Sequence, residues 1–333
     1  MATIYQVSEL AKVSLATVSR VMNGSSRVSD KTREKVQAAM KELGYRPNII
    51  AQSLASNRSL CVGMLVSEIH GPFFGQMMSG VESELRAAGK HVIIAAGHSD
   101  EAKEKEGIEF LISRHCDAII LHVEAVSDEY LIELSQGEVP IILVSRYVEQ
   151  LAEQCISLDN EYGGYLATKT MIEHGHREIA YVAGPQTKAD AVARLKGHKR
   201  ALAEHQLTIS EDLIFEAEFK EHGGMLALEH FLKLNNNFTA LVCANDEMAS
   251  GAMSYARSHG LHLPDDLSII GFDNVVFASH LYPKLSTIEN PVHQMGQMAA
   301  RIVLQQVYHV QQEEIQHQFE PMLINRDSIA DLT

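Results

Sequence analysis

Polar side chains follow several apolar, β-rich segments of this 333-residue chain at the point where each segment ends. They are Ser67 and Glu68, Ser145 and Arg146, Asn245 and Asp246, and Asp273 and Asn274, with Phe73 and Phe74 a few residues beyond the first pair. Carboxylates, amides and an arginine can hydrogen-bond sugar hydroxyls, and an aromatic ring can cover the C–H face of a sugar. These residue types indicate a site for a polyhydroxylated small molecule.

No local pattern indicates catalysis, a metal site or a nucleotide cofactor. Of the 17 histidines, the best-spaced pair is His174 and His176, and it lies between an expected helix and an expected strand, which favours a structural turn over a metal site. Neither a G-x-S-x-G nor an H-E-x-x-H pattern occurs, no G-x-G-x-x-G follows a strand, and no P-loop is present. We therefore expect no enzyme, no metal and no cofactor.

Length and composition are those of a globular protein of two or three domains. Hydrophobic residues make up 46% and charged residues 21% of the chain, and no apolar stretch approaches the roughly 20 residues of a membrane-spanning helix. The N-terminus lacks the pattern of a secretory signal, so we expect a cytoplasmic protein without a membrane partner. The four cysteines lie far apart within or beside apolar segments, which predicts small buried side chains rather than disulfides or metal ligands.

Charge is segregated along the chain. The net charge is −15, yet residues 1–60 contain nine Lys or Arg against four Asp or Glu, a balance of +5, so the remainder carries −20. A basic segment on an acidic body is typical of a phosphate-binding module joined to a module with another task. Charge alone leaves open a solvated helical surface as the alternative.

The basic segment has the pattern of three short helices around a small core. Thr3 is expected to cap the first helix, whose apolar positions are Ile4, Val7, Leu10 and Ala11, and Ser14 is expected to cap the second. Ser29 is placed to cap the third helix, which buries Val36, Ala39, Met40 and Leu43 and ends at Gly44. The short turn between the first two helices matches a helix-turn-helix arrangement, a weak signal by itself.

The particular residues make the signal specific. The stretch ATVSRVMNG, followed by VSDKTREKVQAAMKELGYRPN and then AQSLA, closely resembles the DNA-binding headpiece and hinge of the LacI/GalR family of bacterial transcriptional regulators. The resemblance implies a helix-turn-helix headpiece over residues 1–46, a hinge over 47–58, and a two-lobed effector-binding and dimerisation domain over 59–333.

The resemblance also implies which residues contact DNA. Leu15 and Ala16 would open the recognition helix, where they can offer only apolar contact to a base, while Arg20 can pair with guanine or reach a phosphate. Thr3, Tyr5, Thr17, Ser19 and Asn23 have hydroxyls or amides suited to phosphate contacts. The alternative roles for these polar residues are capping and core packing.

The hinge is expected to form a short helix on DNA. Asn48 can cap it, and the family pattern implies that Leu54 wedges between base steps of the minor groove. The alternative is a simple linker in which Leu54 packs on the body.

From Leu60 onward, apolar β-rich runs alternate with amphipathic helical stretches, as in parallel sheets covered by helices on both faces. A break near residues 155–161 suggests two lobes of similar design. The pattern resembles the α/β periplasmic-binding-protein-like type I fold, with two doubly wound parallel-sheet lobes, that forms the effector domain of the same family.

Ligands in such folds bind beyond the carboxyl ends of the strands, so the cleft between the lobes is the expected site. By the family match, the effector contacts are Phe74, Arg146, Arg194, Asn245 and Asp273, whereas Asp246 is expected to hold the loop. Turn or cap roles for Asp273 and Asp246, a core role for Phe74 and a surface ion pair for Arg146 are the alternatives. The site is similar to that of the galactose and β-glucoside branch, although Ser145 and Glu68 depart from its pattern.

We therefore expect a homodimeric, sequence-specific DNA-binding regulator, most simply a repressor, whose affinity for double-stranded operator DNA is controlled by a small sugar such as galactose or a related glycoside. The alternative within the family is a purine- or nucleoside-responsive regulator. A sugar-transport receptor would need a secretory signal and no headpiece, and a Rossmann-type enzyme would need a glycine-rich phosphate loop.

Overall fold

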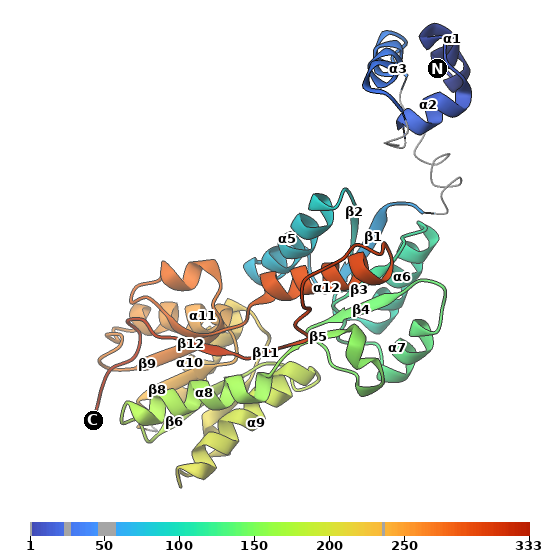
Figure 1. The fold of residues 1–333 in the computed structure, drawn as a ribbon. Helices are drawn as coiled ribbons and strands as arrows, with labels where there is room; N and C mark the ends of the chain where they lie inside the picture. The colour runs from blue at the N-terminus through green and yellow to red at the C-terminus, as the bar shows by residue number, and fades with distance from the viewer. Residues whose placement is uncertain (1, 23–27, 46–57, 235–236) are drawn as a thin grey trace. The chain divides into compact units, whose positions relative to one another are not determined.

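The computed structural model describes residues 2–22, 28–45, 58–234 and 237–333. The chain divides into two compact units, Met1–Leu60 and Cys61–Thr333, which we call the headpiece and the effector unit (Figure 1). The hinge predicted over 47–58, with Asn48 and Leu54, lies outside the described residues except for Arg58.

The headpiece consists of α1 (Ile4–Ala11), α2 (Leu15–Met22) and α3 (Asp30–Glu42). Thr3 and Gln6 form a reciprocal capping box at the start of α1, and Thr17 N donates to Ser14 Oγ at 3.2 Å at the start of α2. Ser29 occupies the N-cap position of α3, but its hydroxyl contacts Thr32 Oγ1 at 2.9 Å instead of a backbone N–H. The predicted caps of α1 and α2 are confirmed, and the predicted cap bond of α3 is replaced by a contact between side chains.

Seven small apolar side chains among the described residues of the headpiece are buried in its core: Val7, Ala11, Val18, Val21, Val28, Val36 and Ala39. Leu10, which the helical spacing assigned to the buried face of α1, is 42% exposed. Its neighbours Val7 and Ala11, one turn apart, already occupy the side that meets the core, so Leu10 lies beside that face rather than within it.

The first lobe of the effector unit is built on a six-stranded sheet in the order β11-β5-β4-β3-β1-β2. Its strands are β1 (Cys61–Val66), β2 (His91–Ala96), β3 (Ile119–Leu121), β4 (Ile141–Val144), β5 (Cys155–Leu158) and β11 (Gln318–Phe319), all paired in parallel. Its helices are α5 (Pro72–Ala87), α6 (Glu101–Ser113), α7 (Asp128–Ser135), the 3-10 segment η1 (Glu149–Gln154) and α12 (Val292–Gln306), which packs beside α5.

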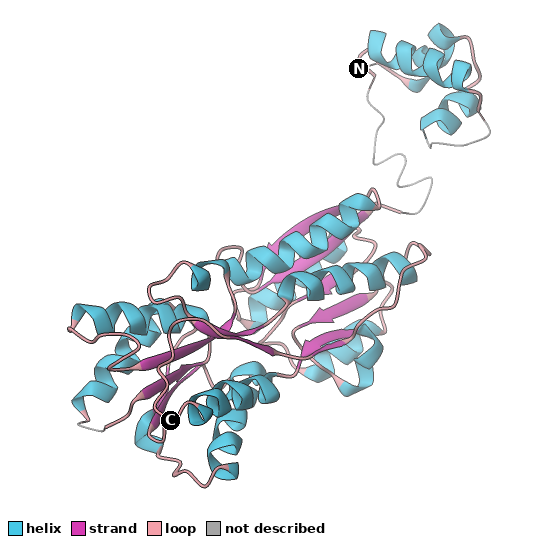
Figure 2. Cartoon of the chain, turned by 60° about the vertical axis from the view of Figure 1, so that its left-hand side comes forward, coloured by secondary structure: helices cyan, strands magenta, loops and turns pink. Residues whose placement is uncertain are grey.

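The second lobe has the same design, with a second sheet flanked by helices (Figure 2). Its strand order is β12-β10-β9-β8-β6-β7. Its strands are β6 (Ile179–Ala183), β7 (Ile214–Glu216), β8 (Ala240–Cys243), β9 (Ser268–Asp273), β10 (Ser286–Glu289) and β12 (Met322–Ile324), and only β12 pairs antiparallel. Its helical segments are α8 (Asn160–Glu173), α9 (Ala189–Glu204), η2 (Glu211–Leu213), α10 (Glu221–Lys233), α11 (Asp246–Ser258) and η3 (Val276–Ser279).

The expected fold class, a helix-turn-helix headpiece with a two-lobed α/β domain of parallel sheets, is confirmed. The predicted break between the lobes coincides with the passage from β5, which ends at Leu158, to α8, which begins at Asn160. The lobes are not consecutive halves of the chain, because α12 and β11 return to the first lobe before β12 ends in the second.

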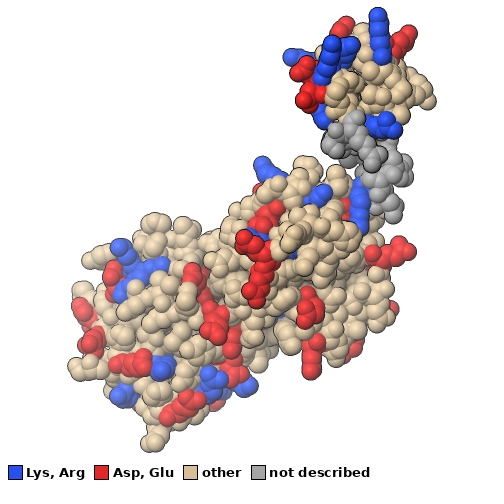
Figure 3. Space-filling view, in the orientation of Figure 1, with Lys and Arg blue, Asp and Glu red and all other residues tan. Residues whose placement is uncertain are grey.

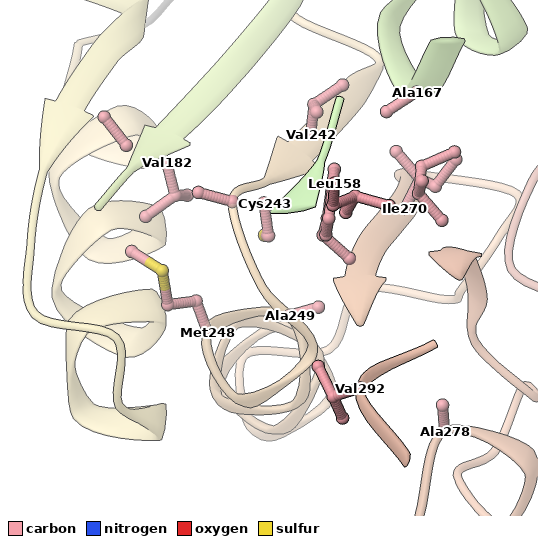
Figure 4. Close-up of a cluster of buried hydrophobic side chains, with 14 of the residues drawn as sticks. Leu158, Ala167, Val182, Val242, Cys243, Met248, Ala249, Ile270, Ala278 and Val292 are labelled. Carbon is pink, nitrogen blue, oxygen red and sulfur yellow. The ribbon is translucent and has the colours of Figure 1, made fainter. Parts of the chain in front are cut away.

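Central strands are buried on both faces, which explains their continuous apolar sequences. In the second lobe Val182, Val242 and Ile270 come from neighbouring strands and pack with Met248 and Ala249 of α11 (Figure 4). None of the four cysteines, all of them described, forms a disulfide, and Cys243 is part of this cluster. The apolar run of β2 is an exception, because it forms a sheet edge and leaves Ile94 39% exposed.

Candidate functional site

Helix α2 presents both apolar and polar side chains to solvent on the face opposite the headpiece core. Val18 and Val21 are buried in that core, so the helical positions between and before them face outward. The exposed residues are Leu15, Ala16, Ser19 and Arg20, the set that the sequence placed on this face. In Figure 3, Lys and Arg side chains stand beside acidic ones on the visible face of the headpiece.

The hydroxyl groups predicted to contact phosphates differ in their local bonds. Thr3 Oγ1 belongs to the capping box of α1, and Thr17 Oγ1 lies 2.9 Å from Ser14 Oγ, so both take part in helix starts. Tyr5 is 69% exposed. Asn23, Asn48 and Leu54 lie outside the described residues. The DNA contacts of all these residues stay predictions.

A cavity of about 1520 Å³ lies between the two lobes of the effector unit. It is lined by residues that follow the carboxyl ends of parallel strands in both sheets, because these ends converge on the same side of each lobe. All five predicted effector contacts, Phe74, Arg146, Arg194, Asn245 and Asp273, line it. The structure thus brings together residues up to 199 positions apart, while their binding role stays a prediction.

Arg194 is the most buried cation of this cavity, with 3% of its surface exposed. Its guanidinium donates from Nε to Asn160 Oδ1 at 2.9 Å and from Nη1 to the carbonyl of Ala244 at 2.6 Å. Its carbon Cζ lies 3.7 Å from the centre of the Phe272 ring, a stacking geometry that suits guanidinium. The side chain is therefore held rigidly, with its remaining nitrogen Nη2 3.5 Å from Asp273 Oδ1.

Asp273 ends strand β9 in a backbone conformation that few residues adopt, with φ of 103°. Burial raises the pKa of its carboxyl to about 6, even though Arg194 and a hydrogen bond from Asn290 Nδ2 at 3.1 Å lower it. The strained backbone and the buried carboxyl are both costly for stability, a pattern found where function constrains a residue.

Asn245 and Asp246 have separate roles, although they are adjacent. Asn245 Oδ1 caps α11 by accepting from Met248 N at 2.9 Å, and its Nδ2 donates to the carbonyl of Phe219 at 3.3 Å. Asp246 is fully buried and accepts from Thr287 Oγ1 at 2.6 Å and from Val275 N at 2.9 Å. Asp246 therefore holds the loop after β9, as expected, and Asn245 is also a helix cap.

On the first lobe, Arg146 and Phe74 contribute a cation and an aromatic ring. Arg146 Nη2 lies 2.7 Å from Asp128 Oδ1, so the ion pair that was the alternative role of Arg146 is present, and both residues line the cavity. Phe74 packs edge-on against Phe73 and His122, with ring centres 5.1 and 5.3 Å apart. This cluster forms an apolar wall of the kind that covers the C–H face of a sugar.

The sequence reasoning missed Glu124, which sits in a dense polar cluster in the same cavity. Glu124 Oε2 accepts from Ser67 Oγ at 3.1 Å and from Ser99 Oγ, and it lies 2.8 Å from Lys188 Nζ. Burial alone would raise the pKa of Glu124, but the charges of His122 and Lys188 and these hydrogen bonds lower it to about 2. Glu124 follows β3 in sequence, so the strand-end pattern could have identified it.

The loop that holds Glu124 is itself fixed by the buried carboxylate of Glu104. The two oxygens of Glu104 accept from the backbone N–H groups of residues 124, 125 and 126 at 2.8 to 3.2 Å. A second pair missed by the sequence reasoning joins Glu68 Oε2 and Lys220 Nζ at 2.6 Å. Glu68 and Glu124 belong to the first lobe, and Lys188 and Lys220 to the second, so both pairs cross the cavity.

The two histidines with the best metal-ligand spacing, His174 and His176, make structural hydrogen bonds instead. His174 Nδ1 is 2.8 Å from the carbonyl of Thr170, and His176 Nδ1 is 2.8 Å from Thr239 Oγ1. Across the described ranges, no group of three or more His, Cys, Asp or Glu is arranged to hold a metal ion. Within the same ranges, no helix combines the length and the apolar character needed to cross a bilayer.

Comparisons with known proteins match both units. The family described as bacterial regulatory proteins, lacI family, matches residues 3–48, and the periplasmic binding protein-like domain matches residues 168–329. The HTH-type transcriptional regulator GalR of Salmonella typhimurium is 37% identical over 330 residues, which cover 99% of this chain and 96% of GalR. The HTH-type transcriptional repressor PurR of Vibrio cholerae is 34% identical over 334 residues, which cover 100% and 99%.

Solved structures are similar over the same span. The Lac repressor dimer bound to operator and the anti-inducer ONPF is 29% identical with a TM-score of 0.87, and the match covers 99% of each chain. A complex of the transcriptional regulator CelR with cellobiose is 31% identical with a TM-score of 0.71, and the match covers 98% of this chain and 100% of CelR.

Proposed function

Because this chain belongs to the lacI family of bacterial regulatory proteins, we propose that it is a repressor whose affinity for operator DNA is controlled by a small sugar. It is a DNA-binding transcriptional regulator with an effector domain and is not an enzyme. The sugar we propose is galactose or a related glycoside. Because we propose that the protein binds operator DNA of a bacterium, we expect it in the cytoplasm.

The cavity between the lobes is the observation that carries the choice of a sugar. It offers carboxylate acceptors in Asp273 and Asp190, donors in Arg146 and Arg194, and an aromatic wall at Phe74. Each sugar hydroxyl both donates and accepts, so a wall with mixed donors and acceptors matches its chemistry. A similar regulator has been solved with cellobiose, which supports a glycoside in a cleft of this fold.

The exposed face of α2 supports the proposed DNA contacts. The exposed guanidinium of Arg20 could pair with guanine in a major groove, whereas Leu15 and Ala16 could offer apolar contact of the kind that thymine methyl groups accept. A similar repressor binds its operator as a dimer, which supports a homodimer here. Two headpieces would then match two half-sites of a near-palindromic operator, and the effector units would supply the dimer surface.

Control of DNA affinity requires that the ligand prefer one arrangement of the lobes. A sugar that binds between the lobes stabilises the arrangement in which both lobes contact it at the same time. Operator affinity then changes only by the difference between the sugar's affinities for the two arrangements.

A thermal-shift screen tests the choice of ligand. We expect galactose or a glucoside to stabilise the protein, by about 2.7 kcal/mol at a concentration 100 times the Kd, and adenosine, guanine and hypoxanthine to have no effect. Arg146→Ala should lose the sugar response, whereas the surface variant Arg86→Ala should retain it, because Arg86 lies on α5 outside the cavity. Stabilisation by the purines alone would refute the proposal that the effector is a sugar.

Fluorescence anisotropy with promoter fragments tests the DNA contacts. Arg20→Ala should weaken binding to the preferred fragment by about 1–3 kcal/mol and reduce its preference over an unrelated fragment. Lys41→Ala removes the same charge from the exposed end of α3, and it should change the affinity for the two fragments by the same factor. Equal losses of selectivity in the two variants would exclude α2 as the reading helix.

A further inference from the structure

The basic groups in the cavity are already engaged by acidic ones. Of the described residues that line it, four are Lys or Arg, and each lies within 4 Å of a carboxylate oxygen. The two arginines face Asp128 and Asp273, as described above. The two lysines, Lys188 and Lys220, face Glu124 and Glu68 from the opposite lobe.

The pair of Lys188 and Glu124 is the more enclosed of the two. Only 20% of the lysine side chain and 17% of the glutamate side chain are exposed, and the glutamate is further bound by the hydroxyls of Ser67 and Ser99. A ligand that attracted Lys188 would have to leave the Glu124 carboxylate buried without its cation. Removing one partner of a buried ion pair is strongly unfavourable.

The N-termini of α8, α9 and α11, the other common kind of anion site in such folds, are also occupied, whereas α5 begins at Pro72 without a side-chain cap or an acidic residue in its first turn. Asp159 caps α8 by accepting from Tyr162 N at 2.8 Å, and Asn245 caps α11 in the same way. The first turns of α9 and α11 add Asp190 and Glu247, and all four residues line the cavity. These side chains cancel the attraction that a helix start offers to a phosphate.

The cavity as a whole is acidic. Among the described residues, ten Asp or Glu line it against four Lys or Arg. Carboxylates accept hydrogen bonds from neutral hydroxyls, whereas they repel the charge of about −1.5 to −2 on a phosphate monoester. Two buried polar atoms of lining residues, Ser145 Oγ and Asn290 Oδ1, have no hydrogen-bond partner among the described residues, and a hydroxyl could supply one.

We propose that Glu68 and Glu124 are specificity-determining residues: by holding Lys220 and Lys188, they make the cavity select uncharged sugars and reject their phosphate esters. This inference rests on the proposed sugar response and narrows its ligand class. It assigns a role to two residues that sequence reasoning did not include among the effector contacts.

Calorimetric titration of the full-length protein with galactose, galactose 1-phosphate and galactose 6-phosphate tests this selection. We expect wild-type protein to bind galactose at least about tenfold more tightly than either ester, a difference of about 1.4 kcal/mol. Glu124→Gln releases Lys188 and should raise the affinity for an ester about tenfold while changing that for galactose much less. Glu68→Gln, at a more exposed pair, is the second variant should Glu124→Gln fold poorly.

The matched control is Glu153→Gln, which removes the same charge from the lining of the same cavity without being the partner of either lysine. It should change the ratio of the galactose and ester affinities much less than Glu124→Gln does, because it removes a repelling charge without releasing a lysine. Wild-type protein that binds an ester as tightly as galactose, or an unchanged ratio in both Glu124→Gln and Glu68→Gln, would overturn the inference.

A separate probe distinguishes failure of this inference from failure of the proposed sugar response. If neither galactose nor its esters bind, the choice of galactose fails. Inorganic phosphate can then still test whether Lys188 is available to bind an anion. Phosphate should then raise the melting temperature of Glu124→Gln and not that of wild-type protein. Stabilisation of the wild type and the variant by the same amount would show that the glutamate does not withhold Lys188.

Discussion

Replacing Asp273 by asparagine should make the effector unit more stable at neutral pH while weakening its response to sugar. Burial raises the pKa of this carboxyl from the ordinary 3.8 to about 6, against the attraction of Arg194 and the hydrogen bond from Asn290. The pKa is thus raised by about two, and a change of one in pKa corresponds to about 1.4 kcal/mol. The ionised carboxylate therefore costs the folded protein about 3 kcal/mol.

The cost depends on pH with a definite sign. Between about pH 4 and pH 6 the folded protein retains the proton on Asp273 that the unfolded chain has released, so stability falls as the pH rises. Below pH 4 both states are protonated and the cost is absent. Above pH 6 both are ionised and the full cost remains. Asparagine avoids this cost, retains an oxygen that can accept from Asn290 Nδ2, and tolerates the positive φ.

Thermal melts of wild type and Asp273→Asn from pH 4 to pH 8 measure this difference. One kcal/mol moves the melting temperature of a unit of this size by about 2 °C, so the variant should melt about 6 °C higher at pH 7.5 and near the wild-type value at pH 4. The same variant should bind galactose more weakly, because an acceptor and a charge are lost from the cavity wall.

Asp190→Asn is the matched control for this experiment. Asp190 lies 3.7 Å from the same guanidinium, but 29% of its side chain is exposed, so removing its charge should change stability by less than about 1 kcal/mol. Two results would refute the assignment of the cost to burial. One is an Asp273→Asn variant with a lower melting temperature than wild type at pH 7.5, and the other is a difference in melting temperature that stays constant from pH 4 to pH 8.

Two further predictions concern packing in each unit. Gly164→Ala should destabilise the effector unit by about 1–3 kcal/mol, because the added Cβ would lie 2.0 Å from the Arg194 carbonyl oxygen. In the control Gly75→Ala the added Cβ meets nothing within 4 Å, so this variant should stabilise α5 by about 0.5–1 kcal/mol. Melting temperatures measure both effects. Val18→Ala should destabilise the headpiece by about 1–3 kcal/mol and weaken operator binding, because it removes volume from the headpiece core. Calorimetry should show an unchanged melting temperature for residues 61–333, and fluorescence anisotropy should show the weaker binding. A lower melting temperature for both units would contradict the prediction that they unfold separately.

Sequence patterns predicted those parts of the structure that depend on neighbouring residues. The caps at Thr3 and Ser14 and the outward face of α2 follow from positions one turn apart, and these features are confirmed. Parallel strands place their carboxyl ends on one side of a sheet, which is why polar residues after such strands, among them Arg146 and Asp273, line a single cavity.

Contacts between distant segments were not predictable in this way. The return of α12 and β11 to the first lobe leaves no mark in local periodicity, because a strand or helix has the same pattern in either lobe. Leu10 shows the same limit at smaller scale, since helical spacing cannot tell which edge of an apolar stripe the partner helices cover.

The amino-acid sequence by itself thus determined the class of each unit, the outward face of α2, and five of the side chains that line the cavity. Only the tertiary structure decided the charge state of the cavity, because the ionisation of Asp273 depends on burial and the partner of each lysine lies on the other lobe. Electrostatic energies depend on distance and solvent exposure in space, and neither is written in the order of residues along the chain.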